Sequence, residues 1–237
     1  MSTPNFRFKQ FTIWHDKCAM KVGTDGVLLG AWSPIGFRSQ DSGVRILDVG
    51  TGSGLIARMM MQRFPEAKVE GIDIDESAVE QAYENGVHAH FSKLQDWNGG
   101  PYDLIVSNPP YFQNSLKNPD KGRELARHTD SLSYAELIHH SARLLTNHGQ
   151  LALILPANAE TEMRLLAEKE GLFPTRVTRV YSKENKPARR VLMAFERIQN
   201  TEYRIQTKLP KEDTLVLEDE KGGRSAAYSE LCKEFYL

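Results

Sequence analysis

A strand, a glycine-rich turn and a helix follow one another early in the chain, and this order limits the possible folds most strongly. Residues 44–50 are mostly aliphatic and β-branched, as expected of a buried strand. The glycine-rich turn 50–54 precedes an apolar helical pattern over 55–64. A second strand over 69–73 and a helix over 75–85 follow. These segments form a βαβ unit, which predicts an α/β fold with a parallel sheet.

The remainder of the chain continues the alternation of strands and helices. The turn at Gly86 is unusually short for a connection between a helix and a strand. The two last strands are joined by a short, charged segment, so we expect them to pair as a hairpin. We treat 1–237 as a single domain, with an N-terminal extension (1–43), a core (44–198) and a C-terminal appendage (199–237). The further predicted strands are 87–94, 102–106, 150–155, 175–181 and 191–196, and the further predicted helices are 133–145, 160–170 and 226–236.

Composition excludes several classes of protein. Of the 237 residues, 40% are hydrophobic and 26% are charged, as in ordinary globular domains. No apolar run approaches the ~18 residues that a membrane span needs, and the polar, basic N-terminus does not resemble a signal peptide. Cys18 and Cys232 show no metal-ligand spacing. We therefore expect a cytoplasmic monomer with reduced thiols, without a metal and without a membrane partner.

Basic side chains cluster locally, although the formal net charge is only −1. Six basic residues lie between Arg176 and Arg190 against a single acid, and the long polar segment 112–130 is also basic. Such clusters can follow a phosphate backbone, although solvated loop charge is the plainer interpretation. The candidate phosphate contacts are Lys121, Arg123, Arg127, Lys186, Arg189 and Arg190.

The tetrapeptide Asn108-Pro109-Pro110-Tyr111 directly follows the predicted strand 102–106. In open α/β sheets, ligands bind at the carboxyl ends of the strands. The two prolines fix φ and have no N–H, so this loop offers carbonyl oxygens without matching donors. Asn108 adds a side-chain carbonyl and Tyr111 adds a flat ring. The combination is suited to binding a planar group with an exocyclic NH2, although a plain Pro-Pro turn is the alternative.

The glycine-rich turn also carries chemistry. Its glycines alternate strictly at Gly50, Gly52 and Gly54, unlike the G-x-G-x-x-G pattern that binds a pyrophosphate. Acids stand at the ends of three successive predicted strands. Asp48 could hold an ammonium group, Asp73 could accept ribose hydroxyls, and Asp96 could accept from an adenine amine. These groups match S-adenosylmethionine, which is cationic and contains no phosphate.

The segment Ile46–Gly54, Asp73, Asp96 and the Asn-Pro-Pro-Tyr tetrapeptide resemble the class I S-adenosylmethionine-dependent methyltransferases that methylate amines. The resemblance implies a Rossmann-like sheet of seven strands, mostly parallel, with a reversed C-terminal hairpin and helices on both faces. It also implies that Asn108, Pro109, Pro110 and Tyr111 are catalytic, with Asn108 also touching the cofactor. The pattern departs from the family only near Gly86.

The stretch from Lys21 to Gly30 and the terminal Phe235-Tyr236-Leu237 narrow the resemblance to the bacterial family that methylates adenine N6 next to the anticodon of valine tRNA. This implies tRNA as the substrate, and adds Lys21 and Thr24 to the cofactor residues. In that reaction the adenine leaves its stack, and alignment of its amine with the methyl group carries most of the catalysis.

Two rival functions remain open from the sequence. Asn-Pro-Pro-Tyr also serves enzymes that methylate glutamine side chains of proteins, or amines of ribosomal RNA and DNA. Glutamine methyltransferases usually carry a helical N-terminal domain, and only about 40 residues precede the first strand of the core here. The second rival is a non-catalytic RNA-binding module that needs the cofactor. The intact tetrapeptide argues against that role.

Overall fold

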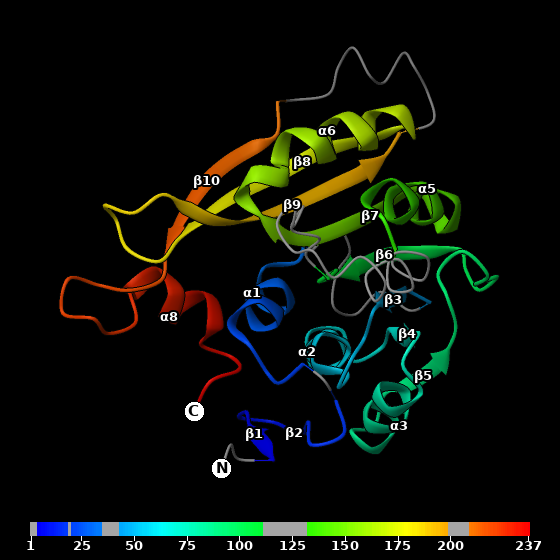
Figure 1. The fold of residues 1–237 in the computed structure, drawn as a ribbon, viewed down its shortest axis with the longest axis horizontal. Helices are drawn as coiled ribbons and strands as arrows, with labels where there is room; N and C mark the ends of the chain where they lie inside the picture. The colour runs from blue at the N-terminus through cyan, green and yellow to red at the C-terminus, as the bar shows by residue number, and fades with distance from the viewer. Residues whose placement is uncertain (1–3, 19, 35–42, 111–131, 199–208) are drawn as a thin grey trace, which may run out of the picture.

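The computed structural model describes residues 4–18, 20–34, 43–110, 132–198 and 209–237. Its main sheet has eight strands in the order β10-β8-β9-β7-β6-β3-β4-β5 (Figure 1). The strands are β3 (Arg45–Val49), β4 (Lys68–Asp73), β5 (His88–Phe91), β6 (Tyr102–Ser107), β7 (Leu145–Pro156), β8 (Leu172–Tyr181), β9 (Ala188–Arg197) and β10 (Lys211–Val216).

Strands β3 to β7 are parallel, whereas β9 runs antiparallel to both β7 and β8. The predicted α/β class and the reversed hairpin are therefore confirmed. The predicted number of seven strands is wrong, because β10 joins the sheet beside β8 in a parallel register. The sequence analysis missed β10 because its residues Lys-Glu-Asp-Thr-Leu-Val are half charged and lack an alternating pattern.

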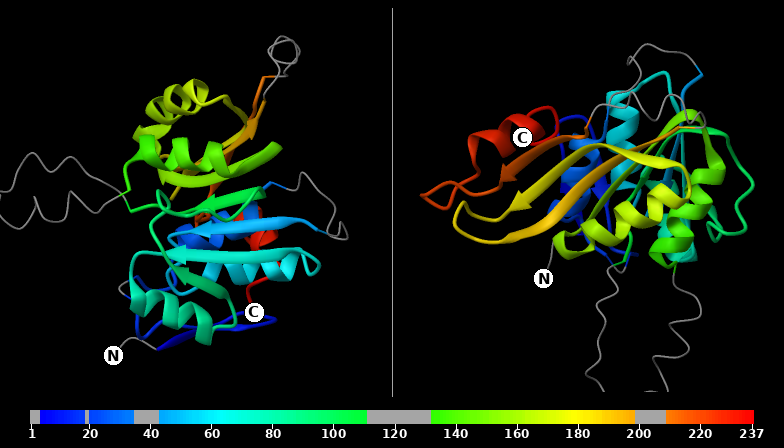
Figure 2. Two further views of the ribbon diagram at one scale, coloured as in Figure 1. Left: turned by 90° about the vertical axis from the view of Figure 1, so that its right-hand side faces the viewer. Right: turned by 90° about the horizontal axis from the view of Figure 1, so that it is seen from above.

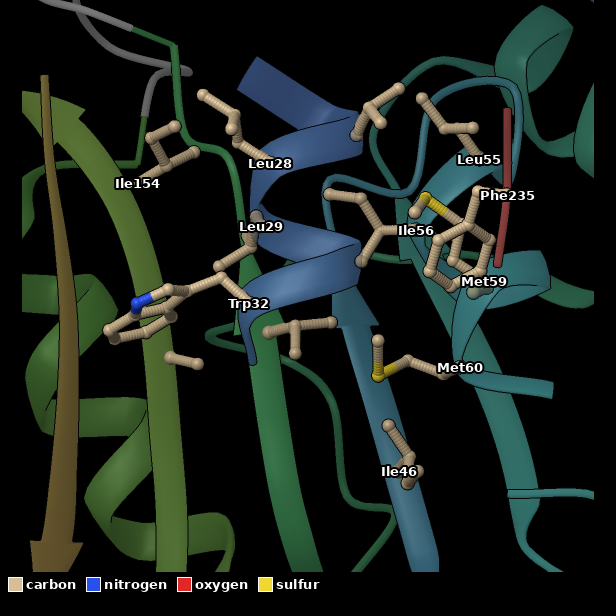
Figure 3. Packing of buried hydrophobic residues seen from close by; sticks show 14 of the residues in the cluster. Leu28, Leu29, Trp32, Ile46, Leu55, Ile56, Met59, Met60, Ile154 and Phe235 are labelled. Atoms are coloured by element: carbon tan, nitrogen blue, oxygen red, sulfur yellow. The ribbon is translucent and has the colours of Figure 1, made fainter. Parts of the chain in front are cut away.

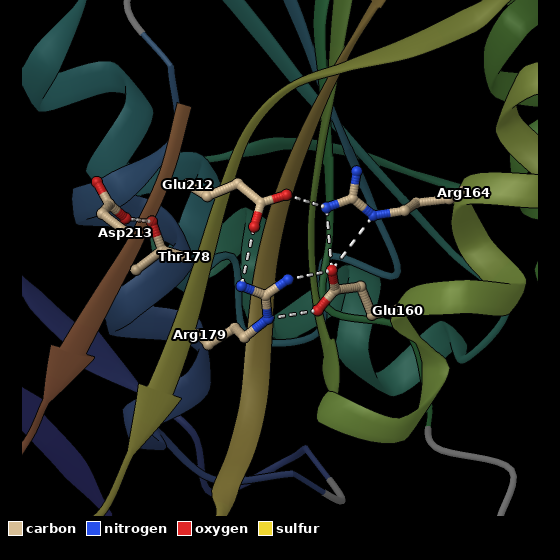
Figure 4. A network of polar contacts seen from close by, with 6 residues as sticks. All are labelled: Glu160, Arg164, Thr178, Arg179, Glu212 and Asp213. Atoms are coloured by element: carbon tan, nitrogen blue, oxygen red, sulfur yellow. Dashed lines mark hydrogen bonds and ion pairs between the residues drawn. The ribbon is translucent and has the colours of Figure 1, made fainter. Parts of the chain in front are cut away.

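Ion pairs hold this charged edge strand in place (Figure 4). Glu212 of β10 accepts hydrogen bonds from Arg179 of β8 at 3.0 Å and from Arg164 at 2.8 Å. Both guanidinium groups also donate to Glu160, whose side chain is 16% exposed. Asp213 accepts a hydrogen bond from Thr178. The charged residues that made β10 hard to predict from the sequence are thus the residues that connect it to its neighbours.

The helices lie on both faces of the sheet, as predicted (Figures 1 and 2). One hydrophobic cluster includes side chains of α1, α2 and α8, and a second cluster on the other face includes side chains of α5 and α6. Among the described residues, no helix has both the length and the apolar character that a membrane crossing requires. The helices are α1 (Thr24–Trp32), α2 (Leu55–Arg63), α3 (Glu76–Glu84), α5 (Tyr134–Leu144), α6 (Glu160–Lys169) and α8 (Ala226–Cys232), with a short 3-10 helix at Ala157–Ala159.

Close packing of α1 against α2 fixes the position of α1 above the sheet (Figure 3). A Cβ atom added at Gly30 would lie 2.9 Å from Met59 Cε and 3.0 Å from its Cβ, so a larger residue here would force the Met59 side chain to move. Arg63 at the end of α2 donates to the carbonyl oxygens of Gly30 and Ser33, both at 2.8 Å. These bonds satisfy the carbonyls that a helix C-terminus leaves without partners. The Trp32 indole donates to Thr178 of β8 at 2.8 Å.

The N-terminal segment forms a small hairpin of β1 (Asn5–Arg7) and β2 (Thr12–Trp14) that packs against the C-terminal residues. The rings of Phe8 and Tyr236 are stacked with centroids 6.1 Å apart. The backbone N–H of Lys9 donates to the Phe235 carbonyl at 2.8 Å. The two ends of the chain therefore meet on the α2 side of the sheet (Figure 1).

The short connection at Gly86 is a compact C-cap of α3. Gly86 has φ = 79°, its N–H bonds the Tyr83 carbonyl, and the Val87 N–H bonds the Ala82 carbonyl. This pair of bonds is a Schellman motif, which ends a helix and turns the chain within two residues. The connection is therefore short because of its geometry, and the departure from the family pattern leaves β5 in its usual place beside β4.

We expect Gly86→Ala to lower the free energy of unfolding by about 1–2 kcal/mol, because a side chain strains the left-handed conformation. Gly86→Asn should cost less, because asparagine tolerates this conformation. Urea denaturation of the three proteins measures both changes. Equal stability of the alanine variant and the parent chain would contradict this account of the turn.

Candidate functional site

The carboxyl ends of β3, β4 and β6 meet at one edge of the sheet, where they border a cavity of about 480 Å³. Such edges are where open α/β sheets bind ligands. The N-terminal segment, the helix α3 and the chain after β5 complete its wall. The cavity is lined by Cys18, Met20, Val49, Gly50, Gly52, Ile72, Asp73, Ile74, Asp75, Ala78, Ser92, Lys93, Leu94, Gln95, Ser107, Asn108, Pro109, Pro110 and Leu132.

The glycine-rich turn forms the floor of the cavity. Gly50 and Gly52 adopt φ = 70° and 55°, a conformation that glycine reaches without strain. A Cβ added at either position would meet no described atom within 4 Å, so this backbone faces open space. The N–H groups of Gly50 and Thr51 both donate to the Ile72 carbonyl, at 2.9 and 3.0 Å. The turn is therefore fixed to β4 and leaves room for a bulky ligand.

Asp48 is fully buried behind this turn and does not line the cavity. Its Oδ2 accepts bonds from the Thr51 hydroxyl at 2.8 Å and from the Ala57 N–H at 3.1 Å, whereas Oδ1 has no partner in the part of the chain that the structure describes. Burial raises the pKa of this carboxyl to about 7. The sequence analysis expected Asp48 to hold an ammonium group, but the structure places it where it orients the turn.

Asp73 occupies the position that the sequence predicted, at the end of β4 and in the wall of the cavity. Its Oδ2 accepts the Gly52 N–H at 2.8 Å, and its Oδ1 accepts the Asp75 N–H at 3.0 Å. These bonds hold the carboxylate still, and each oxygen keeps a further lone pair for a ligand hydroxyl. Ile74, next along the chain, is 52% exposed and offers an apolar surface inside the cavity.

Asp96 lies outside the set of cavity-lining residues, in contrast to the sequence analysis. Its backbone N–H donates to the Lys93 carbonyl at 3.2 Å, and its own carbonyl accepts a bond from the Asn98 side chain at 3.1 Å. The chain after β5 reaches the cavity earlier, through residues 92–95. The sequence analysis placed the third strand as far as Leu94, whereas β5 ends at Phe91.

Asn108 lies where two cavities meet. It borders the large cavity and also a second cavity of about 300 Å³. The second cavity is lined by Lys21 and Thr24, and by Ser53 and Leu55 on either side of Gly54. Pro109 is buried and Pro110 is exposed, and both face the large cavity. The Ser107 hydroxyl donates to the Val49 carbonyl at 2.8 Å, which ties the end of β6 to the end of β3. Tyr111 lies outside the described residues.

Residues of the N-terminal segment close one side of both cavities. Cys18 and Met20 line the large cavity, although nothing in their sequence pattern indicated a role there. Lys21 donates from Nζ to the carbonyls of His15 and Cys18 at 2.6 and 3.2 Å. Lys21 therefore stabilises this segment, and it also borders the second cavity.

The basic loop between β8 and β9 shares the edge of the sheet with Asn108. Register pairing aligns Ser107 with Leu153 and Arg190 with Pro156, so the antiparallel β9 begins where the parallel strands end. Arg190 is not free at this edge, because its Nε donates to Asp25 of α1 at 2.8 Å. Lys186 and Arg189 are exposed. The predicted contacts Lys121, Arg123 and Arg127 lie outside the described residues.

Comparison with known proteins agrees with this geometry. Residues 37–173 match the methyltransferase small domain family, and the chain belongs to it. Two solved structures share the fold. A predicted O-methyltransferase of Agrobacterium tumefaciens is 14% identical and superposes with a TM-score of 0.65, covering 89% of this chain and 96% of that chain. A class I S-adenosylmethionine-dependent methyltransferase of Listeria monocytogenes, described as putative, is 16% identical with a TM-score of 0.57, covering 83% of this chain and 65% of that chain. The methyltransferase fold is therefore confirmed.

Closer relatives extend over the whole length. A protein of Bacteroides fragilis is 43% identical, covering 100% of this chain and 99% of its own, and one of Parabacteroides distasonis is 44% identical with the same coverage. A protein of Pseudoalteromonas translucida is 38% identical over 98% of both. All three are named tRNA1(Val) (adenine(37)-N6)-methyltransferase. The chain belongs to the family of these enzymes, which confirms the resemblance in the sequence.

The buried Asp48 predicts a characteristic pH dependence of stability in the absence of ligand. Between its unfolded pKa, about 4, and its folded pKa of about 7, the folded chain keeps a proton that the unfolded chain has released. The free energy of unfolding should therefore fall as pH rises through this window and change no further above it. In Asp48→Asn this contribution should disappear. Denaturant titrations of both proteins from pH 5 to about 8 measure the difference, and parallel profiles would contradict it.

Proposed function

We propose that this protein transfers the methyl group of S-adenosylmethionine to the exocyclic N6 amine of adenine 37 in a valine tRNA. The observation that carries the proposal is the position of Asn108 and Pro109, which border the same cavity as the glycine-rich turn and Asp73. The names of the full-length relatives support the choice of tRNA and of this adenine. We also propose that it acts as a monomer in the cytoplasm, where bacterial tRNA is modified.

The donor set of the cavity fits S-adenosylmethionine. The open backbone at Gly50 and Gly52 leaves room for the body of the molecule, and the Asp73 carboxylate can accept its ribose hydroxyls. Ile74 and Leu94 offer apolar surface to a purine ring. No described lysine or arginine except Lys93 borders the large cavity, which agrees with a ligand that contains no phosphate.

S-adenosylmethionine supplies a methyl group on a cationic sulfonium, and the amine must be aligned with it. The N6 lone pair of adenine is delocalised into the ring, so the nitrogen is a poor nucleophile. We assign the Asn108 side-chain oxygen and the Pro109 carbonyl as acceptors for the two N6 hydrogens. Bonds from these hydrogens favour a pyramidal nitrogen, whose lone pair then points toward the methyl group. Preorganised acceptors and correct alignment supply most of the rate.

The same edge of the sheet supplies a surface for RNA. The loop between β8 and β9 lies at this edge, and so does the chain that follows β10. The two segments are joined there, because the Leu217 N–H bonds the Tyr181 carbonyl and the Glu218 N–H bonds the Ser182 carbonyl. Lys186 and Arg189 are exposed basic residues at this edge of the sheet. We propose that they contact phosphates, and that Arg190 positions the loop through Asp25.

The rival functions have less support. The relatives named above give no support for ribosomal RNA, DNA or protein as the substrate.

We expect Asn108→Ala to lower kcat for methyl transfer to tRNA by about 10²-fold or more, because it removes one preorganised acceptor. Transfer of labelled methyl groups to total tRNA measures the rate, and digestion to nucleosides identifies N6-methyladenosine. Asn98→Ala is the matched control, since Asn98 does not line the cavity and its side chain donates to the Asp96 carbonyl at 3.1 Å. An Asn108→Ala enzyme with the rate of the parent chain would refute the assigned role, and label in protein would favour the glutamine alternative.

We expect Lys186→Ala combined with Arg189→Ala to weaken tRNA binding and to reduce the slope of log K against log salt by about 1 to 2, since each phosphate contact contributes about 0.7–0.9. Filter binding at several salt concentrations measures both quantities. Lys68→Ala with Lys169→Ala is the control, because these exposed lysines lie at the opposite edge of the sheet. The same slope in both double variants would exclude the loop from the RNA surface.

A further inference from the structure

Three side chains of metal-binding type gather on the outer part of the sheet, away from the residues assigned to methyl transfer. Glu70 of β4 and His88 and His90 of β5 each offer one ligand atom, and these atoms all lie within 4.8 Å of one another. The sequence analysis expected no metal because it examined only cysteine spacing. The His88-Ala89-His90 segment becomes informative only when the sheet brings Glu70 beside it.

The arrangement follows from strand geometry. Alternate residues of a strand face the same side of a sheet, so His88 and His90 point to one face. Glu70 is the register partner of His88 in the adjacent parallel strand, which places the carboxylate on that face as well. The two imidazole rings have centroids 4.5 Å apart and are nearly perpendicular. The three ligands therefore come from rigid backbone and not from loops, which favours a defined site.

The remaining contacts of these residues leave donor atoms available. The Arg45 guanidinium and the Tyr102 hydroxyl both donate to Glu70 Oε2, at 3.0 and 2.9 Å. No described residue donates to Oε1. His90 Nε2 is buried and has no hydrogen-bond partner among the described residues, although a buried polar atom normally has one. A bound cation would satisfy this nitrogen and use the free carboxylate oxygen.

We propose that Glu70, His88 and His90 bind a zinc ion. Two imidazoles and one carboxylate form a known zinc ligand set, with a water molecule in the fourth position. Three ligands at zinc distances lie about 3.4 Å apart, so rotation of the side chains is enough to close the site. Magnesium and calcium prefer oxygen ligands and match this set poorly. His88 is exposed, so an ion can enter from solvent.

Further hydrogen bonds and packing contacts hold the three metal-binding side chains in position. Tyr102 and Arg45 fix the Glu70 carboxylate, and the Arg45 guanidinium also lies 4.8 Å from the centre of the Tyr102 ring and bonds the Gly100 carbonyl at 2.7 Å. The His90 ring packs against Trp97, with centroids 4.9 Å apart. In known metal sites, hydrogen bonds and packing around the ligating side chains raise metal affinity about 10–100-fold.

The location of the zinc gives it a structural effect. β5 is the edge strand of the sheet and is joined to the sheet through β4 alone. An ion shared by Glu70 of β4 and two histidines of β5 would fasten this edge. Residues 92–95, which line the large cavity, follow β5 directly. Zinc would therefore restrict the motion of one cavity wall without touching the reacting groups.

The test uses the full-length chain, freed of metal with a chelator and titrated with zinc chloride by calorimetry. We expect one zinc ion per chain, and a rise of Tm in its presence. His88→Ala and His90→Ala should each weaken binding at least about tenfold and make the rise of Tm at a given zinc concentration smaller. Because His88 is exposed, its variant should fold, and an unchanged Tm without zinc checks this. His139→Ala is the matched control, since it removes another histidine that pairs with a glutamate, Glu170.

Two results would overturn the site. One is the absence of zinc uptake by the parent chain at zinc concentrations several times that of the protein. The other is equal zinc binding by the parent chain and His88→Ala, which would mean adventitious binding elsewhere on the surface. Loss of binding in His88→Ala and His90→Ala with full binding in His139→Ala supports the proposal. Because the readouts are binding and Tm, the outcome does not depend on the proposed methyl transfer.

Discussion

The site depends on one buried carboxylate. Asp48 bridges the end of β3, the glycine-rich turn and the first turn of α2 through bonds to the Thr51 hydroxyl and the Ala57 N–H. These bonds act together with those that tie the turn to β4, and they hold a segment whose glycines impose few conformational restrictions of their own. Burial of Asp48 disfavours its charged form, as the raised pKa shows. Burying the carboxylate therefore lowers stability locally, but it fixes the backbone at the floor of the cavity.

The direction of the strands then decides which loops meet the ligand. Parallel β3, β4 and β6 bring the glycine-rich turn, Asp73 and Asn108 to one edge. The antiparallel β9 brings the start of a strand, and with it the basic loop, to that edge too. A parallel strand at the position of β9 would have sent this loop to the far side. The reversed hairpin thus connects the topology of the sheet to the surface that we propose for RNA.

Local patterns predicted most of the fold and part of the site. The strand, turn and helix at 44–64 and the position of Asp73 are determined by neighbours in the sequence, so pattern analysis predicted them. β10 was missed because its charges are stabilised by Glu160, Arg164 and Arg179, which are distant in the sequence. Likewise, the wall formed by Cys18 and Met20, and the cluster around Glu70, exist only after distant segments are brought together.

The contact between the two ends of the chain has a consequence for biosynthesis. The ribosome releases the segments that carry the glycine-rich turn and Asn108 early, whereas Phe235 and Tyr236 emerge after the whole of the sheet. The N-terminal hairpin packs on these late residues, and the segment that follows the hairpin closes the cavity. The packing of the hairpin on these residues is therefore completed only after Phe235 and Tyr236 have been synthesised, whereas the contacts of Trp14 and Lys17 with Asn85 and α3 involve residues that emerge much earlier.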